Sequence, residues 1–373
     1  MAKISKRIAH LLPVLLLPSM ASLATEDKPE YHFYNSDAKV EIDGELSEAV
    51  WQQATKMELR YNINPGDNTP APVKTEVMLF EDGESVYIAF KAYDPNPEDI
   101  RAYYRNRDTI FQDDFVGIVL DTFNDERRAY EFFVNAYGVQ GDLIKDDSQG
   151  GYEDSNWDAI WDSAGRITDE GYVVEMAIPF KALRFPSDQK AMTWGIDALR
   201  VYPRDSRMVL ASNRSERDID CHLCQISKIN GLKDLKQGNN FQLTPTLTAT
   251  RGDTKDDING PWQEGDVNAE AGLDLRWGIN QNLYLNATLN PDFSTVEADA
   301  AQLDVNNTFA LFTREKRPFF LDGKDYFNTQ QMNLVHTRNI NAPDYGVKLT
   351  GKNGKHTYGV MTANDDTTSF LMP

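Results

Sequence analysis

The chain has 373 residues, 40% of them hydrophobic, and a formal net charge of −20. This length is sufficient for two domains, each with its own core. A polyanion of this size repels phosphate backbones, so the charge excludes nucleic acid as an expected partner. It leaves open a neutral or cationic ligand, a bound divalent ion, or a role in solubility alone.

Residues 1–24 are predicted to be a secretory signal peptide. The basic start M-A-K-I-S-K-R is followed by the apolar H-L-L-P-V-L-L-L-P-S-M and the small residues A-S-L-A, with cleavage expected after Ala24. The apolar run is too short to span a bilayer. Loss of Lys3, Lys6 and Arg7 takes the formal charge from −20 to −23. We therefore expect an exported protein.

Residues 31–236 are predicted to form antiparallel β-strands. The segments V-K-T-E-V-M-L-F (73–80) and S-V-Y-I-A-F-K-A-Y (85–93) both alternate apolar and polar residues, which is typical of a hairpin with one buried face. A short helix is expected after the Asp43–Gly44 turn, with Ser47 as its N-cap. Many strands and few helices predict a two-sheet sandwich. Further strands are expected at 115–120, 129–137, 172–180 and 194–202.

The two cysteines form the motif C-H-L-C at Cys221 and Cys224. Haem attachment needs a histidine directly after the second cysteine, where Gln225 stands, and a zinc site needs two more soft ligands than this segment offers. An oxidising compartment favours a disulfide. We predict a local disulfide that fastens a loop, and a redox-active pair is the alternative.

Residues 238–373 contain segments of about ten residues that alternate along their whole length, as outer-membrane β-barrel strands do. The alternative is a second soluble β-domain. A closed barrel needs at least eight strands, and five are counted, so we expect the N-terminal part of a truncated barrel. The predicted strands are 241–250, 269–279, 283–290, 345–351 and 356–363.

Two groups of sequence blocks carry a family resemblance. The first group is A-K-V-E-I-D-G-E-L-S-E-A-V-W (38–51), D-D-F-V-G-I-V-L-D-T-F (113–123), Y-E-F-F-V-N-A-Y-G-V-Q-G-D (130–142), W-D-A-I-W-D (157–162), G-Y-V-V-E-M-A-I-P-F-K-A-L-R-F (171–185) and W-G-I-D (194–197). It resembles the family 9 carbohydrate-binding modules in the broad sense, which are DOMON-like sandwiches of the jelly-roll type. The second group is N-P-D-F-S-T-V-E-A-D (290–299), E-K-R-P-F-F-L-D-G (315–323) and D-Y-G-V-K-L-T-G-K (344–352). It is similar to the barrel region of large bacterial outer-membrane proteins that carry such a module.

This resemblance implies an all-β protein in which an exported module at 31–236 binds a saccharide ligand and residues 238–373 begin a barrel in the outer membrane. The sandwich is expected in the periplasm or at the cell surface. A module of this kind is non-catalytic. The alternatives are a glycan-processing hydrolase that acts on O-glycosyl bonds in carbohydrate catabolism, and a purely structural envelope protein.

The stretch S-N-W-D-A-I-W-D-S supplies the predicted saccharide site. Sugar binding needs aromatic faces and a few fixed polar groups, which Trp157, Trp161, Asn156 and Asp158 offer together. Trp157 lies in polar sequence and is expected to be exposed. Trp161 begins a strand that pairs with 172–180, so we expect its ring in the core.

The stretch R-N-R-D-T-I-F-Q-D-D (105–114) adds charged candidates. Arg107 can hold sugar hydroxyls, and the carboxylates Asp113 and Asp114 are weak candidates for a structural calcium ion. No EF-hand spacing is present, so a structural salt-bridge cluster is the main interpretation. Calcium is the only cofactor considered.

Catalysis is not expected. A glycosidase needs two carboxylates across a cleft, and Asp114, Asp121 and Glu175 can be named only because acidic residues are abundant. The hydrolase and metalloprotease motifs G-x-S-x-G and H-E-x-x-H do not occur in the sequence. The charged run Glu315, Lys316 and Arg317 is costly on a lipid-facing strand. We expect it to plug the barrel lumen, with a periplasmic turn as the alternative.

Overall fold

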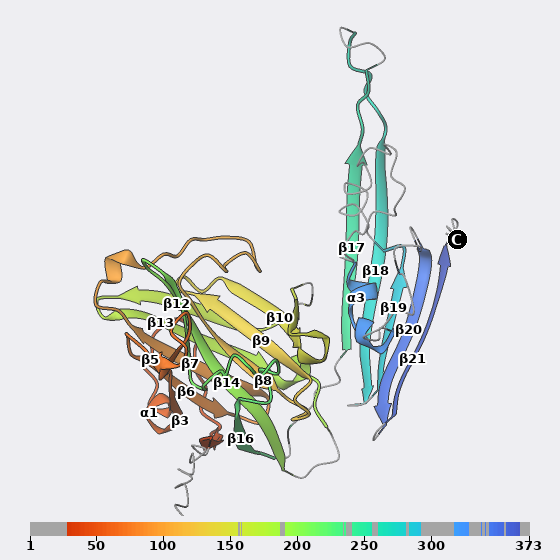
Figure 1. Cartoon of the computed structure of the whole chain (residues 1–373). Coiled ribbons are helices and arrows are strands. Elements are labelled where there is room, and N and C mark those ends of the chain that lie inside the picture. The colour runs from red at the N-terminus through yellow and green to blue at the C-terminus, as the bar shows by residue number, and fades with distance from the viewer. Residues whose placement is uncertain are drawn as a thin grey trace, which may run out of the picture.

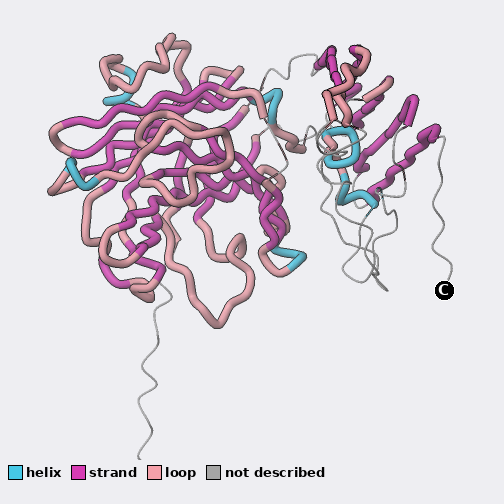
Figure 2. The backbone as a smooth tube through the Cα atoms, turned by 90° about the horizontal axis from the view of Figure 1, so that it is seen from above, coloured by secondary structure: helices cyan, strands magenta, loops and turns pink. Residues whose placement is uncertain are grey.

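The computed structural model describes most of the chain between residues 28 and 365 (Figure 1). The predicted signal peptide and residues 366–373 lie outside the described residues. Seen from above, strands dominate both parts of the chain and the helical segments are short (Figure 2). The described residues are 28–155, 157, 159–186, 191–233, 235, 241–255, 260–280, 283–291, 317–327, 337, 340, 343–353 and 356–365.

In the described part of the chain, ten strands form sheet A in the order β11-β10-β9-β8-β14-β15-β4-β5, with β16 beside β14 and β1 beside β16. All neighbours are antiparallel except β1 and β16. The strands are β1 (Glu30–His32), β4 (Tyr61–Asn64), β5 (Thr69–Pro70), β8 (Phe115–Asp121), β9 (Arg128–Asn135), β10 (Gln140–Asp146), β11 (Tyr152–Asp154), β14 (Met192–Pro203), β15 (Arg207–Ala211) and β16 (Ser227–Leu232).

Sheet B has the order β12-β13-β7-β6-β2, with β3 also paired to β6. Its strands are β2 (Tyr34–Asn35), β3 (Thr55–Glu58), β6 (Thr75–Glu81), β7 (Ser85–Tyr93), β12 (Asp162–Thr168) and β13 (Gly171–Pro179). Short helical turns connect the strands of the two sheets. They are α1 (Val50–Gln53), η1 (Pro97–Asp99), η2 (Asp147–Gln149) and η3 (Phe180–Ala182).

Sheets A and B pack face to face and enclose one large apolar core. Alternate side chains of each strand point inward, as in Phe132 of β9, Phe90 of β7 and Trp194 of β14, all of which are fully buried. The prediction of an all-β antiparallel fold with an N-terminal sandwich is confirmed. The strand predicted at 85–93 coincides with β7.

The Asp43–Gly44 turn is held on the outer face of sheet B by a buried carboxylate. Gly44 has φ of +86°, and both backbone amides donate to Glu175 Oε2, at 3.1 Å from Asp43 and 2.8 Å from Gly44. The helix α1 follows this turn, as predicted. The expected Ser47 cap is wrong, because α1 begins after Ala49 and has no side-chain cap.

The C-terminal strands form a separate sheet C in the order β17-β18-β19-β20-β21, antiparallel throughout. Two helical turns, α3 and η4, pack against one face of it, and β17 and β18 continue into a long hairpin (Figure 1). The elements are β17 (Phe241–Arg251), β18 (Val267–Asn280), β19 (Leu283–Leu289), α3 (Pro318–Leu321), η4 (Lys324–Phe327), β20 (Pro343–Asn353) and β21 (His356–Asp365). Among the described residues, no helix is long and apolar enough to cross a membrane.

One arginine joins the sandwich to sheet C. Arg184 follows η3, and its Nη2 lies 2.9 Å from Asp322 Oδ1 while its guanidinium lies 3.9 Å from the ring centroid of Tyr284 on β19. The side chain of Asp322 also accepts a hydrogen bond of 2.6 Å from Asn286 Nδ2. The two parts of the chain are therefore in direct contact through a charged, largely buried group.

The segment between β11 and β12 turns both of its tryptophans into the core. The ring centroid of Trp161 lies 5.2 Å from that of Phe132, and Trp157 lies 4.9 Å from Tyr130 and 5.9 Å from Phe132. The exposed fractions are 4% for Trp161 and 9% for Trp157. The expected core position of Trp161 is confirmed. The expected exposure of Trp157 is wrong, because the polar residues around it do not prevent the chain from folding over Phe132.

We predict that Trp157→Ala and Trp161→Ala each lower the free energy of unfolding by about 3–5 kcal/mol, the usual cost of truncating a buried aromatic residue. Ile160, between them, is 69% exposed, so Ile160→Ala is the matched control and should change stability by less than about 0.5 kcal/mol. Denaturant unfolding of the three variants measures this. A Trp157→Ala variant as stable as the Ile160→Ala control would contradict the core assignment.

Candidate functional site

The outer face of sheet A carries buried charge at its centre. Side chains of β9 that point away from the core include Glu131 and Phe133, because Phe132 between them points inward. Glu131 is only 2% exposed. Strand register places it in a row across four strands, with Leu143 of β10 on one side and Val119 of β8 and Asp197 of β14 on the other.

An aromatic group lies beside this charged row. Phe111, Phe115 and Phe133 contact one another edge to face, with ring centroids 5.4–5.9 Å apart. Phe133 lies over Gly117, where an added Cβ would come within 2.0 Å of its ring. A larger residue at position 117 would displace the ring. The sheet thus offers an apolar aromatic surface next to fixed polar groups.

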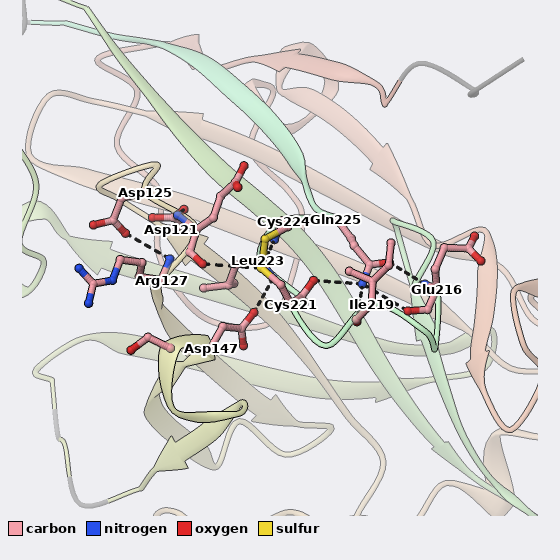
Figure 3. Close-up of a disulfide and its surroundings, with 12 residues drawn as sticks. Asp121, Asp125, Arg127, Asp147, Glu216, Ile219, Cys221, Leu223, Cys224 and Gln225 are labelled. Atoms are coloured by element: carbon pink, nitrogen blue, oxygen red, sulfur yellow. Dashed lines mark hydrogen bonds between the residues drawn. A yellow bond between two sulfur atoms is a disulfide. The ribbon is translucent and has the colours of Figure 1, made fainter. Parts of the chain in front are cut away.

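A loop closed by a disulfide lies at the other end of the row, and Figure 3 shows its contact with Asp147. Cys221 and Cys224 are joined in a disulfide, and the backbone amide of Leu223 donates to Asp147 Oδ2 at 2.7 Å. Leu223 and Ile226 pack on the sheet against Val119 and Ala129. The loop is therefore fixed both by its covalent bond and by its contacts with sheet A.

This loop brings His222 to the charged row. Its Nε2 lies 3.2 Å from Asp197 Oδ2. Burial alone would lower the pKa of His222, but the hydrogen bond and the negative charge of Asp197 raise it above its ordinary value. Asp197 therefore stabilises the protonated form of His222.

Lys145 of β10 completes the group. Its Nζ lies 3.2 Å from Glu153 Oε1 and 4.0 Å from Glu131 Oε1. Burial raises the pKa of Glu131 to about 7, although the positive charge of Lys145 opposes this shift. We call Glu131, Lys145, Asp197 and His222 the sheet A cluster. It presents both signs of charge from three strands and one loop.

Two buried atoms of the sheet A cluster have no hydrogen-bond partner among the described residues. They are Oε2 of Glu131 and Nδ1 of His222. A buried polar atom without a partner costs about 1–3 kcal/mol, so each of these atoms is expected to have a partner such as an ordered water molecule or a ligand. A ligand with hydroxyl groups can donate to the carboxylate and accept from, or donate to, the imidazole.

The residues predicted from sequence as the saccharide site lie elsewhere. The rings of Trp157 and Trp161 face the core between the sheets, whereas the sheet A cluster lies on the opposite face of β9. Asn156 and Asp158 lie outside the described residues. Saccharide contact by this segment stays a prediction.

Arg107 fastens the same segment to the sandwich. Its Nη1 donates to Gln140 Oε1 at 2.6 Å, and its Nη2 donates to Asp142 and, at 2.7 Å, to the carbonyl of Ala159. Asp142 Oδ2 in turn accepts from the amide of Ala159 at 2.6 Å. Burial raises the pKa of Asp142 to about 6, against the opposing hydrogen bond from that amide. These contacts give Arg107 a structural role.

The carboxylates considered for calcium are bound by arginines instead. Asp113 lies 3.1 Å from Arg105 Nε, Asp114 lies 2.9 Å from Arg204 Nη1, and both carboxylates are fully buried. In the part of the chain that the structure describes, no group of three or more His, Cys, Asp or Glu side chains could hold a metal ion. The calcium hypothesis is therefore not supported, because cationic side chains already neutralise these groups.

The carboxylates named for glycosidase chemistry also have structural partners. Glu175 holds the turn at Gly44 on sheet B, Asp121 Oδ2 accepts from the amide of Glu126 at 2.9 Å, and Asp114 Oδ2 accepts from the amide of Arg101 at 2.8 Å. Glu175 and Asp121 lie on different sheets. None of these contacts places two of the three carboxylates opposite each other, as a glycosidase needs.

Sequence reasoning did not find the sheet A cluster. One signal was present: in Y-E-F-F-V-N (130–135), Glu131 shares its face of the strand with Phe133, so one charge stands on an otherwise apolar side. His222 stands between the cysteines of a predicted loop. Nothing local indicated that this loop would lie over β9.

The sheet A cluster predicts a defined pH dependence of stability. The pKa of Glu131 is raised in the folded protein. The contribution of this residue to the free energy of unfolding is therefore fully present below its ordinary pKa and is lost as the pH rises through about 7. Glu131→Gln should therefore lose less stability than the wild type between about pH 5 and about pH 8. Denaturant unfolding across this range measures the difference.

The control is Glu153→Gln. This substitution removes an exposed carboxylate that also contacts Lys145. It should leave the slope of stability against pH close to that of the wild type. Equal slopes for Glu131→Gln and the wild type would contradict the burial of an ionisable Glu131.

Comparison with known proteins assigns the two parts of the chain differently. Residues 42–208 match the family model for the carbohydrate family 9 binding domain-like proteins, and residues 242–364 match a domain of unknown function, DUF5916. No curated protein matches the chain.

Three solved structures are similar to the sandwich. Two are of a carbohydrate-binding module of family 9 from Caldicellulosiruptor kristjanssonii. The complex with cellotriose is 15% identical, with a TM-score of 0.39 over 55% of this chain and 96% of that one. The complex with glucose is 14% identical, with a TM-score of 0.39 over 55% of this chain and 98% of that one. A candidate carbohydrate-binding protein from Bacteroides uniformis is 13% identical, with a TM-score of 0.42 over 54% of this chain and 99% of that one.

The family-model match covers the segment that holds Glu131, Lys145 and Asp197. Residues 42–208 are therefore similar to the carbohydrate family 9 binding domains.

Proposed function

We propose that the sandwich binds a saccharide on the outer face of sheet A. The sheet A cluster supplies a carboxylate, an ammonium and an imidazole in fixed positions, and the half-buried Phe111 supplies an apolar side chain near them. Small-molecule sites commonly combine aromatic walls with a few placed polar groups. The observation that carries the proposal is the match of residues 42–208 to the family 9 carbohydrate-binding domains.

The charge of the cluster favours a neutral, hydroxyl-rich ligand. Glu131 and Asp197 are acids while Lys145 and His222 are bases, so a ligand of either net charge would meet groups of its own sign. Sugar hydroxyls both donate and accept hydrogen bonds and can serve all four groups. The match of residues 42–208 to the family 9 carbohydrate-binding domains supports this choice.

We predict that the full chain gives a signal on a glycan array and that Glu131→Gln and His222→Ala weaken that signal by roughly tenfold or more, the usual effect of losing a hydrogen bond to a charged group. The array should include glucose and cellotriose, which two of the similar structures contain. It is run once with calcium and once with a chelator.

Glu175→Gln is the matched control. Glu175 is also a buried glutamate whose pKa burial raises to about 7, but it lies on the outer face of sheet B. It should bind as the wild type does. An array without any signal in either condition would overturn saccharide binding, and an equal loss in Glu175→Gln would overturn this location of the site.

We propose further that sheet C belongs to a β-barrel in the outer membrane of an exported protein. One face of the sheet carries apolar residues in register across all five strands, and much of this face is exposed. For example, Leu247 is 79% and Val360 65% exposed. One such row consists of Phe241, Trp277, Leu285, Leu349 and Val360.

The opposite face of sheet C is polar, and its side chains on β19 and β20 are buried. Asn286, Thr288, Lys348 and Thr350 are at most 4% exposed. A soluble sheet normally buries its apolar face, so this pattern is inverted. Transmembrane barrels show the same inversion, because lipid contacts their outer surface and their interior is polar.

The segment from α3 to η4 covers this polar face. This position supports the proposed lumen plug. Lys348 Nζ donates to the carbonyls of Phe319 and Asp322, and Phe319 lies over Gly346 of β20. Arg317 is 3% exposed and donates to the carbonyl of Thr337 at 2.9 Å. Glu315 and Lys316 lie outside the described residues.

We predict that Leu247→Arg weakens association of the chain with lipid vesicles, because a charged side chain on the exposed apolar face of sheet C opposes contact with lipid. Thr244→Arg places the same charge on the same strand but on its other face, and should associate as the wild type does. Flotation of refolded chain with phosphatidylcholine vesicles measures this. The lipid-facing assignment would be contradicted if the wild type did not float with the vesicles, or if both variants lost flotation to the same extent.

A further inference from the structure

The disulfide between Cys221 and Cys224 closes a very small ring. The two cysteines are three positions apart, and the sequence contains no other cysteine. The stabilisation that a disulfide gives by constraining the unfolded chain grows with the length of the segment it closes. A ring of this size therefore contributes little to the stability of the fold, and a structural role alone is a weak explanation for the bond.

Non-covalent contacts hold the backbone on both sides of the disulfide. Gln225 is buried, and its Nε2 donates to the carbonyls of Ile219 at 3.2 Å and Cys221 at 3.1 Å (Figure 3). The amide of Leu223 donates to Asp147, and the side chain of Leu223 is fully buried. None of these contacts uses a sulfur atom. The loop can therefore keep its conformation when the disulfide is reduced to two thiols.

The two cysteines are accessible, and one sulfur has a hydrogen-bond donor. Cys221 and Cys224 are both half-buried, so each keeps part of its surface in solvent. The amide of Cys224 donates to Cys221 Sγ at 3.1 Å. A backbone N–H that points at a sulfur atom stabilises the thiolate form, which is the nucleophilic form of cysteine. Exposed disulfides are also the ones that are reduced most readily.

A lysine lies next to the disulfide. Lys28 Nζ donates to the carbonyl of Cys224, and burial together with the positive charge of Lys228 lowers the pKa of Lys28. Glu126 is the acidic neighbour of these lysines, and its Oε1 lies 3.4 Å from Lys228 Nζ. An ammonium beside a cysteine favours the thiolate. The surroundings of the pair thus combine accessibility with two groups that stabilise a negative sulfur.

We propose that Cys221 and Cys224 form a thiol–disulfide exchange site that acts on disulfides of peptides or proteins. The thiolate of Cys221 attacks one sulfur of the substrate disulfide and forms a mixed disulfide, while the other substrate sulfur leaves as a thiolate and takes up a proton. Cys224 then loses its proton and attacks Cys221 Sγ. This step releases the second substrate thiol and restores the Cys221–Cys224 disulfide.

A dithiol reductant completes the cycle, because it supplies the two electrons and two protons that return the pair to thiols. The reductant itself becomes a disulfide. This inference is independent of the proposed saccharide binding, and neither depends on the outcome of the other.

The first test measures turnover by the full chain. A dye-labelled glutathione disulfide is the substrate, and its fluorescence rises on reduction by dithiothreitol. The wild type should accelerate this reduction by about tenfold over dithiothreitol alone, the usual gain in thiolate at neutral pH for the first cysteine of such a motif. The matched control is the double variant Cys221→Ser and Cys224→Ser, which should react no faster than dithiothreitol alone.

The second test identifies the attacking sulfur. Cys224→Ser cannot complete the second step, so Cys221 should stay joined to glutathione as a mixed disulfide that intact-protein mass spectrometry detects. Cys221→Ser should form this adduct about tenfold more slowly, because Cys224 lacks the stabilised thiolate.

The third measurement shows whether exchange occurs in the folded chain. After treatment with dithiothreitol and without denaturant, a maleimide should label both cysteines, and reduction should lower the melting temperature by less than about 5 °C. Labelling only in denaturant, a wild-type rate equal to that of the double variant, or no adduct in Cys224→Ser would overturn the exchange site. Faster adduct formation in Cys221→Ser than in Cys224→Ser would overturn the role of Cys221.

Discussion

The sandwich depends on covering both faces of sheet A. The inner face meets sheet B, but the outer face also carries apolar side chains, among them Phe115, Phe133 and Val119. Exposed apolar surface of this extent is unfavourable in water, so the loop before β8 and the disulfide loop fold over it. They bring charged groups with them. Glu131 is buried by this covering, whereas His222 of the disulfide loop stays 20% exposed, and each keeps one atom without a partner among the described residues.

Strands and local turns could be predicted from the sequence because alternation is a local signal. The segment 85–93 coincides with β7, and the Asp43–Gly44 turn precedes α1 as expected. The site could not be predicted in the same way, because β9, β10, β14 and the disulfide loop supply its members, and only strand pairing and the packing of the loop bring them together. Trp157 shows the same limit: its polar neighbours suggested exposure, whereas contact with Phe132 decided its burial.

Sheet C illustrates a second limit of sequence patterns. Alternation along β19 predicts two different faces, but not which of them meets water. The structure shows the polar residues Asn286 and Thr288 buried under the α3–η4 segment and Leu289 exposed. The contact of Arg184 with Asp322 joins the sandwich to this sheet. Capture of a glycan beside a membrane barrel is the role that we propose for these features.

The most direct test of the central claim is the pKa of Glu131 with and without a bound saccharide, followed by carbon-13 NMR of glutamate carboxyl groups. Hydrogen bonds from sugar hydroxyls favour the carboxylate, so the account predicts that saturating saccharide lowers this pKa from about 7. Glu175, whose pKa is also raised to about 7 but which faces the Gly44 turn, is the internal reference and should not change. A saccharide that binds while the pKa of Glu131 stays constant would contradict the location of the site on sheet A.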